Sequence, residues 1–176
     1  MVKTYYSWQD VNTAATNIAL KMYKDGWKPD YIVGLNRGGL PISVMLSHLL
    51  NCNHYALDVR LRDNATQESN CWMAEDAFGY HDGQCKPKMR KQILIVDDIN
   101  DTGATFNWIM KDWQSGCLPN SEGWNDVWND NVRFATLTDN LASEFTEHCA
   151  YTCHEINKAD EDVWLVYPWE NVGTYG

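Results

Sequence analysis

Three acidic residues and a small, hydroxyl-rich turn follow one another near the middle of the chain. Asp97 and Asp98 are adjacent, Asp101 follows shortly after, and residues 102–105 read Thr-Gly-Ala-Thr. Adjacent carboxylates can accept hydrogen bonds from the neighbouring hydroxyls of a ribose ring. Free backbone N–H groups in such a turn, together with the dipole of a following helix, favour a phosphate group. The pattern therefore predicts a site for a sugar phosphate.

The elements around this motif place it at the edge of a sheet. Residues 93–96 read Ile-Leu-Ile-Val, a run typical of a strand buried on both faces of a parallel sheet. The acid pair then lies at the carboxyl end of the strand, where open α/β sheets bind ligands. A helix is expected after the turn, over residues 106–114. The alternative is an ordinary strand, turn and helix in which the acids only cap the helix.

A second loop offers another position for an anion. Residues 31–34 predict a short buried strand, and Pro41 fits the first turn of a helix that runs to about residue 50. The loop between them contains one arginine and two consecutive glycines. Because it precedes a helix N-terminus, it too can bind an anion.

The rest of the chain alternates between helices and strands. A helix is predicted over about residues 7–25, opened by Ser7 and Asp10 in the manner of a capping box. Two polar segments, residues 62–90 and 115–131, show no clear period, and the second resembles a surface insertion. Further strands are predicted at residues 54–61, 132–138, 151–156 and 163–167. This order predicts an α/β fold with a parallel sheet and helices on both faces.

Composition narrows the class of protein. The chain has 176 residues, enough for one domain, and a net charge of -10, which argues against a nucleic-acid or anionic-membrane partner. It contains no apolar run long enough to span a bilayer, and its N-terminus does not resemble a signal sequence. We therefore expect a cytoplasmic protein with reduced cysteines.

Histidines and cysteines cluster in residues 148–154, which read His-Cys-Ala-Tyr-Thr-Cys-His. On a strand, Cys149 and Cys153 would share one face and the two histidines the other, so the possible zinc ligands would be divided. The cluster also lacks a Cys-x-x-Cys pair. Ordinary packing is therefore favoured over a zinc site.

The motif at residues 93–105 resembles the phosphoribosyl pyrophosphate (PRPP) signature of the type I phosphoribosyltransferases. Residues 34–41 resemble the pyrophosphate loop of the purine enzymes in that family. Residues 162–170 resemble the base-binding hood of bacterial xanthine-guanine phosphoribosyltransferases. The resemblance covers nearly the whole chain and is weakest in the two polar segments.

The resemblance implies a single phosphoribosyltransferase domain over residues 1–176, with a core at about 28–140. A small hood would be formed by about residues 141–176, and the N-terminal residues are candidates to join it. Residues 62–90 have no obvious match to the mobile loop of the family, although a closing loop is expected there to exclude water.

The resemblance also assigns roles to individual residues. Arg37 and the backbone of Asn36, Gly38 and Gly39 would hold pyrophosphate, and a cis peptide bond is expected between Leu35 and Asn36.

The acid motif would serve the ribose, the metal and the chemistry. Asp97 and Asp98 would bind the ribose hydroxyls and reach Mg²⁺, directly or through water, and Asp101 would be the catalytic residue beside N7 of a purine. Trp164 would stack on the base, and the backbone of Leu165 would meet its edge. The 5′-phosphate would be held by Thr102, Gly103, Ala104 and Thr105.

One position departs from the family pattern. Family members place a lysine at the end of the strand that matches residues 132–138, where it donates to the 6-oxo group of the purine. Asn140 occupies that place here and is the expected base-binding residue. Since an amide can both donate and accept, the identity of the acceptor base is left open.

The function implied by the resemblance is transfer of the 5-phosphoribosyl group from PRPP to a nitrogenous base, above all a purine, with release of pyrophosphate. It further implies Mg²⁺ as cofactor and a homo-oligomer, either a dimer or a tetramer. The alternative is a non-catalytic regulatory protein that binds PRPP or a nucleotide on the same fold.

Overall fold

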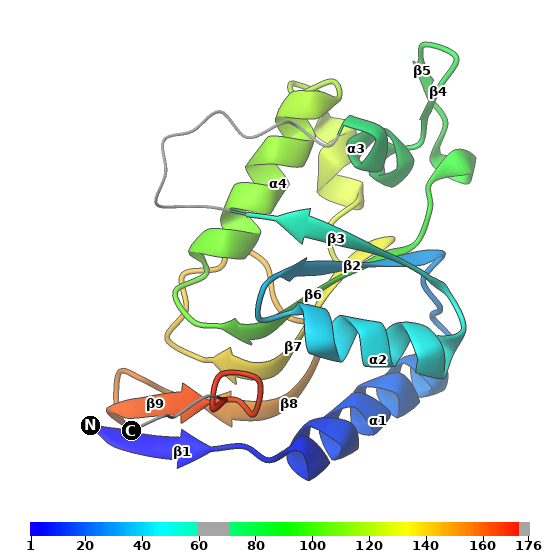
Figure 1. Cartoon of the computed structure of the whole chain (residues 1–176). Coiled ribbons are helices and arrows are strands. Elements are labelled where there is room, and N and C mark those ends of the chain that lie inside the picture. Colours follow the sequence, from blue (N-terminus) through cyan, green and yellow to red (C-terminus); the bar gives the residue numbers. More distant parts are fainter. Residues whose placement is uncertain (60–70, 173–176) are drawn as a thin grey trace.

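The computed structural model describes residues 1–59 and 71–172, and its centre is a five-stranded sheet in the order β3-β2-β6-β7-β8 (Figure 1). All neighbouring strands in it are parallel, so their carboxyl ends lie at one edge. The strands are β2 (Tyr31–Asn36), β3 (Asn53–Asp58), β6 (Ile93–Asn100), β7 (Val132–Asn140) and β8 (Tyr151–Ile156). The predicted parallel α/β architecture is confirmed.

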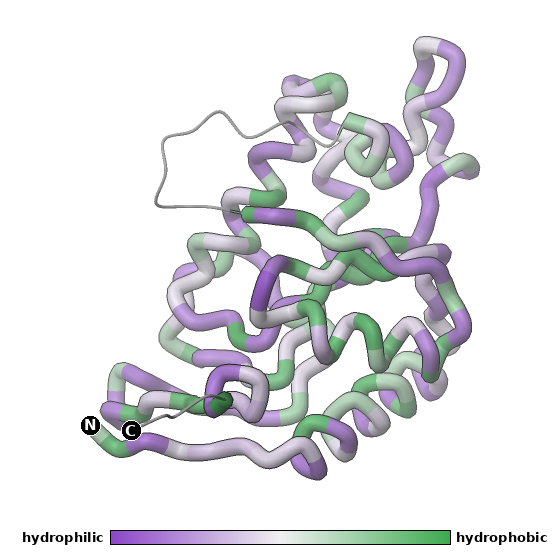
Figure 2. Tube along the Cα trace, viewed as in Figure 1, coloured by the Kyte–Doolittle hydropathy of each residue, from purple (hydrophilic) through white to green (hydrophobic). Residues whose placement is uncertain are grey.

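Helices cover both faces of this sheet (Figure 1). One face carries α1 (Trp8–Asp25) and α2 (Leu40–Leu50), and the other carries α3 (Cys71–Phe78) and α4 (Ala104–Gly116). Strand β6 shows why its sequence is apolar throughout: Ile93 and Ile95 pack in the core under α3 and α4, whereas Leu94 and Val96 pack in the core under α1 and α2. Figure 2 shows the hydrophobic residues concentrated in the central strands.

The boundaries of α1 follow from its two caps. The Ser7 backbone N–H donates to Asp10 Oδ2 at 2.8 Å, and the Asp10 backbone N–H donates to Ser7 Oγ at 3.0 Å. Gly26 ends the helix at φ 66°, a left-handed conformation that glycine adopts readily. The predicted capping box is confirmed.

Two strands from opposite ends of the chain form a separate small sheet. Strands β1 (Val2–Tyr5) and β9 (Val163–Val166) pair in parallel. Figure 1 shows them side by side at the end of the molecule toward which the arrowheads of β6 and β7 point. The chain start therefore supports the segment that carries the predicted base-binding residues.

The segment at residues 62–90 contains more regular structure than its sequence predicted. Residues 62–70 lie outside the described part of the chain, but α3 follows, then the hairpin of β4 (Tyr80–His81) and β5 (Gln84–Cys85), and the short helix η1 (Pro87–Met89). The expectation of an aperiodic stretch is wrong for this part. Helix α3 has only 8 residues, too few for its period to stand out in a sequence.

The expectation of a polar surface insertion at residues 115–131 is also wrong. The segment contains η2 (Glu122–Asp126), and the side chains of Trp124, Val127 and Trp128 are buried in the core. Trp124 stacks on Trp128 with ring centroids 5.4 Å apart. Because polar residues separate these buried side chains, the sequence shows no period that would reveal them as core residues.

The cysteines at the start of β8 do not share a face. Because β8 begins at Tyr151, Cys149 lies before the strand and packs on the α3–α4 side, whereas Cys153 packs on the α1–α2 side. The expectation of a shared face is therefore wrong. Within residues 1–59 and 71–172, no group of three or more His, Cys, Asp or Glu side chains is arranged to hold a metal ion. In the same residues, no helix is long and apolar enough to cross a lipid bilayer.

Candidate active site

The acid pair lies inside the last part of β6, because this strand continues to Asn100 and does not end at Val96. The Asp98 backbone N–H donates to Asp97 Oδ1 at 2.9 Å. Burial, and next to it repulsion from Asp98, raises the pKa of Asp97 well above its ordinary value, and burial also raises the pKa of Asp98. Hydrogen bonds from hydroxyl groups, or a nearby cation, would stabilise the charged carboxylates and lower both pKa values. The pair is therefore suited to a ligand.

The loop after β2 lies directly against these acids. A Cβ atom on Gly38 would collide with the carboxylate of Asp98, and one on Gly39 would collide with the Val96 carbonyl oxygen. Only glycine therefore allows the loop to approach β6 this closely. The two loops that the sequence singled out are thus neighbours in space.

The backbone of this loop contains a cis peptide bond between Asn36 and Arg37. The expected position between Leu35 and Asn36 is therefore wrong by one residue. The family pattern locates the loop, and it does not determine which of two consecutive peptide bonds is cis.

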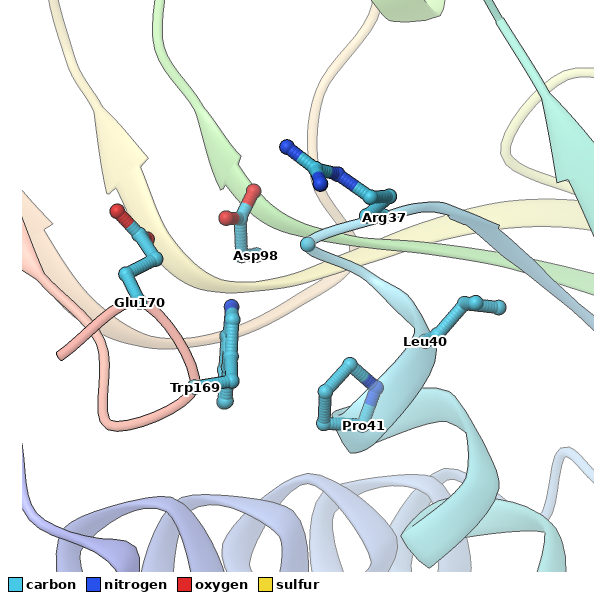
Figure 3. A pocket seen from close by; sticks show the side chains of 7 residues that line it. Arg37, Leu40, Pro41, Asp98, Trp169 and Glu170 are labelled. Carbon is cyan, nitrogen blue, oxygen red and sulfur yellow. The ribbon is translucent and has the colours of Figure 1, made fainter. Parts of the chain in front are cut away.

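A cavity of about 870 Å³ opens between this loop and the C-terminal segment (Figure 3). Trp169 Nε1 is buried there and has no hydrogen-bond partner among the described residues. In the view of Figure 3 this nitrogen lies on the side of the indole toward Asp98. A ligand with an acceptor atom could satisfy it. The cavity is lined by Arg37, Gly38, Leu40, Pro41, Asp98, Trp169 and Glu170.

The predicted phosphate turn begins α4. Gly103 has φ 88°, and a Cβ atom there would collide with the backbone nitrogen of Phe145. Thr102 Oγ1 accepts a hydrogen bond of 3.2 Å from the Ala104 backbone N–H. A hollow of about 170 Å³ lies at this turn, with Thr102, Gly103 and Thr105 in its lining. The hollow thus lies at a helix N-terminus, a kind of position where proteins bind anions.

A third hollow, of about 150 Å³, separates Asp101 from the predicted hood. Trp164 is 51% exposed and Leu165 is 8% exposed, so a large part of the indole-bearing residue at this hollow is open to solvent. The lining consists of Asp98, Ile99, Asp101, Lys158, Trp164, Leu165, Tyr167 and Glu170.

Asp98 lines all three of these hollows, so they meet at one residue. Most of the predicted site residues border one of them. Asn36, Gly39, Ala104 and Asn140 do not appear among the described lining residues. Asn140 is 5% exposed and makes its hydrogen bonds within the protein.

Sequence reasoning missed Lys158, which lies between β8 and β9. Its Nζ is 3.0 Å from Asp101 Oδ1 and 3.1 Å from Oδ2, and 5.9 Å from the Trp164 ring centroid. A lysine in a polar turn gives no periodic signal, and its meeting with Asp101 depends on how β8 is placed in the sheet.

Three residues of the C-terminal segment also belong to the site and were not predicted. The Tyr167 hydroxyl lies 3.2 Å from the Asp98 carbonyl oxygen, and Trp169 stacks on Tyr167 with a centroid separation of 5.0 Å. Burial, and next to it Asp98, raises the pKa of Glu170. The hood pattern contained all three residues, but their approach to β6 is a tertiary contact.

Comparison with known proteins identifies the class. The model of the phosphoribosyl transferase domain matches residues 1–170. A hypoxanthine-guanine phosphoribosyltransferase of Schizosaccharomyces pombe is 23% identical, with 96% of this chain and 89% of the relative covered. The chain therefore belongs to the phosphoribosyltransferase family, and it is an enzyme of the type I class, close to the purine salvage members.

Solved structures show the same fold. A purine phosphoribosyltransferase from Pyrococcus horikoshii Ot3 superposes with a TM-score of 0.65 at 24% identity, covering 100% of this chain and 99% of the other. The xanthine-guanine-hypoxanthine phosphoribosyltransferase of Helicobacter pylori gives a TM-score of 0.63 at 16% identity, with 96% and 94% covered. These likenesses confirm the parallel-sheet α/β architecture expected from the sequence.

Proposed function

We propose that this enzyme transfers the 5-phosphoribosyl group from PRPP to a purine base and releases pyrophosphate. The observation that carries the proposal is the meeting of three hollows at Asp98. One borders a helix N-terminus, one borders a glycine loop with an arginine, and one borders an exposed indole. These surroundings suit the phosphate, the pyrophosphate and the base of the two substrates. The purine class is supported by the name of the S. pombe relative.

PRPP would lie across the carboxyl edge of the sheet. Its 5′-phosphate would accept hydrogen bonds from backbone N–H groups of the turn at residues 102–105. The ribose hydroxyls would donate to Asp97 and Asp98. The pyrophosphate would occupy the large cavity, where Arg37 and the backbone of Gly38 line the wall.

The reaction would begin with cleavage of the bond between C1 of the ribose and the pyrophosphate oxygen, which leaves an oxocarbenium-like sugar. Arg37 would stabilise the charge that develops on the departing pyrophosphate. The base nitrogen would then attack C1 from the opposite face. Asp101 would accept the proton that the purine loses, since it lines the hollow where the base fits.

The side chains present fit Mg²⁺. Mg²⁺ prefers carboxylate and phosphate oxygens, and Asp97 and Asp98 supply two adjacent carboxylates whose pKa values are raised by burial. When bound with PRPP, the ion would neutralise charge on the pyrophosphate. Asp97 and Asp98 would hold it directly or through water.

The test is pyrophosphate release from PRPP and Mg²⁺ across a panel of purine and pyrimidine bases, with the double variant Asp97→Asn, Asp98→Asn in parallel. We expect base-dependent release by the parent protein. The double variant should bind PRPP about tenfold more weakly or worse, because charge-assisted hydrogen bonds are lost. Asp130→Asn is the matched control, because Asp130 is exposed to solvent and lines none of the three hollows. This variant should behave as the parent.

Two results would count against the proposal. Calorimetric PRPP affinity that is unchanged in the double variant would contradict the site. PRPP binding without pyrophosphate release from any base would favour the non-catalytic regulatory protein instead.

A further inference from the structure

A positive charge lies beside the predicted catalytic acid, although the end of β7, where the family places a lysine, carries Asn140 instead. Lys158 Nζ is within 3.0 and 3.1 Å of the two Asp101 carboxylate oxygens. The Lys158 side chain is 26% exposed and lines the same hollow as Trp164 and Leu165. A hydrogen-bond donor and an acceptor thus lie side by side at the hollow of about 150 Å³, which we call the base hollow.

Asn140 holds this lysine in place. Its Nδ2 donates to the Asp101 carbonyl oxygen at 2.8 Å, and its Oδ1 accepts from the Lys158 backbone N–H at 3.0 Å. Oδ1 also accepts from the Ala142 backbone N–H at 3.2 Å. The amide is thereby used at both ends, and its effect is to fasten the turn that carries Lys158 against the loop that carries Asp101.

The turn around Lys158 is itself fixed by hydrogen bonds. Asn157 Oδ1 accepts from the Ala159 backbone N–H at 3.0 Å, and Asn157 Nδ2 donates to Asp160 Oδ2 at 3.0 Å. The lysine therefore extends from an ordered turn, which favours a defined position for its ammonium group.

We propose that Lys158, rather than Asn140, is the residue that selects the base, by donating to the exocyclic oxygen of a 6-oxopurine. This inference rests on the proposed function and narrows its substrate class to 6-oxopurines. In the purine tautomer that leaves N9 free to attack, N7 carries a hydrogen next to the oxygen on C6. That edge offers an acceptor beside a donor, and the Lys158–Asp101 pair offers the complementary donor beside an acceptor.

The same geometry rejects 6-aminopurines. An amino group on C6 presents a second donor, which would face the ammonium group without an acceptor between them. The ammonium group has three N–H donors and the carboxylate has two oxygens, so a 6-oxopurine can bind to both while the ion pair persists. Trp164 can stack on the ring, since its indole is exposed beside the hollow.

The experiment compares kcat/KM for hypoxanthine and for adenine in the parent, Lys158→Met, Lys158→Arg and the control Lys24→Met, whose lysine lies on the exposed surface of α1. We expect the parent to prefer hypoxanthine. Lys158→Met should lower the ratio about tenfold to a hundredfold through the KM for hypoxanthine, because one charge-assisted hydrogen bond is lost. The KM for PRPP should stay within about threefold, Lys158→Arg should keep part of the preference, and Lys24→Met should keep all of it.

Titration with GMP and AMP separates this inference from the proposed function. Selective GMP binding that Lys158→Met abolishes, in a parent that forms no nucleotide, would overturn the function and support recognition of the oxo group by Lys158. Turnover in the parent with an unchanged ratio in Lys158→Met would overturn the role of Lys158 and leave the function standing. If Lys158→Met does not fold, a Lys158→Arg variant with the full parental ratio, KM and GMP affinity would also count against a position-specific contact.

Discussion

Among single residues, Asp101 has the most specific predicted role. It lines the base hollow and pairs with Lys158. If it accepts the proton of the purine, Asp101→Asn should lower kcat by about 10²–10⁴-fold, the usual contribution of a general base. PRPP affinity should change far less, because the ribose and phosphate contacts remain. Steady-state rates within a factor of about three of the parent would show that Asp101 has no such role.

Asn140 and Lys158 are expected to act as one unit, with Asn140 as the positioning residue. Asn140→Ala should lower the preference for hypoxanthine over adenine in the same direction as Lys158→Met. In a double-mutant cycle, the second substitution should add little to the first, because both remove the same donor from the base. Fully additive losses in the logarithm of the ratio would mean that the two side chains act separately. Thermal unfolding of each variant provides the control for a general loss of stability.

The sequence alone left base selection open, and the reason is physical. Asn140 could be located by its place at the end of a strand, whereas Lys158 reaches Asp101 only through the pairing of β8 with β7. Sequence patterns reveal residues that are close along the chain. The contact between Lys158 and Asp101 joins two irregular segments that are far apart in sequence, so no pattern indicates it. The acid pair and the phosphate turn could be predicted because each is contiguous in sequence.

At the level of secondary-structure elements, the phosphate turn depends on Gly103. Gly103→Ala should destabilise the protein by at least about 1 kcal/mol, because a left-handed backbone is costly with a Cβ atom, and the added atom would also collide with Phe145. The turn must shift to relieve the collision, so PRPP affinity should fall as well. Thermal unfolding and calorimetric titration measure the two effects.

Gly26→Ala is the matched control for that substitution. Gly26 also has a positive φ, of 66°, but nothing lies within 4 Å of an added Cβ atom. The Gly26→Ala variant should be less stable than the parent and should keep the parental PRPP affinity. Equal PRPP affinity in the Gly103 and Gly26 variants would contradict a phosphate site at the turn.

Elements with strong local signals were predicted well, and those that depend on tertiary contacts were not. The ends of helix α1 were predicted to within one residue, because its capping box and its C-terminal glycine can both be recognised in the sequence. Strand β1 was missed because its residues are exposed and its partner β9 lies at the other end of the chain. Helix α3 was missed because it is short, and it is held by burial of residues such as Met73 and Phe78.

At the level of the whole molecule, the two ends of the chain support one another at the site. In the β1–β9 sheet, Lys3 is paired with Trp164 and Thr4 with Leu165. Deletion of residues 1–5 should therefore loosen the base hollow and raise the KM for the base several-fold, with little change in the KM for PRPP. The substitution Lys3→Met, which keeps the strand, is the control. An unchanged KM for the base after deletion would show that β1 does not support this region.

The charge of the molecule makes a further cation important for PRPP. The net charge is -10. Asp98 and Glu170 line the cavity that Arg37 also lines, and Asp97 lines the hollow at the phosphate turn. We therefore expect PRPP affinity to fall sharply when Mg²⁺ is removed by a chelator and to return when Mg²⁺ is restored. Equal affinity with and without Mg²⁺, measured by calorimetry, would contradict this requirement.

The homo-oligomer implied by the family stays a prediction that light scattering can check.

The most direct measurement is a mass balance of the products formed from PRPP, Mg²⁺ and hypoxanthine. We expect the nucleoside 5′-monophosphate and pyrophosphate to accumulate in equal amounts, at a rate that Asp101→Asn lowers by about 10²-fold or more. Pyrophosphate formed together with ribose 5-phosphate and no nucleotide, or PRPP bound with no product at all, would contradict phosphoribosyl transfer to a purine.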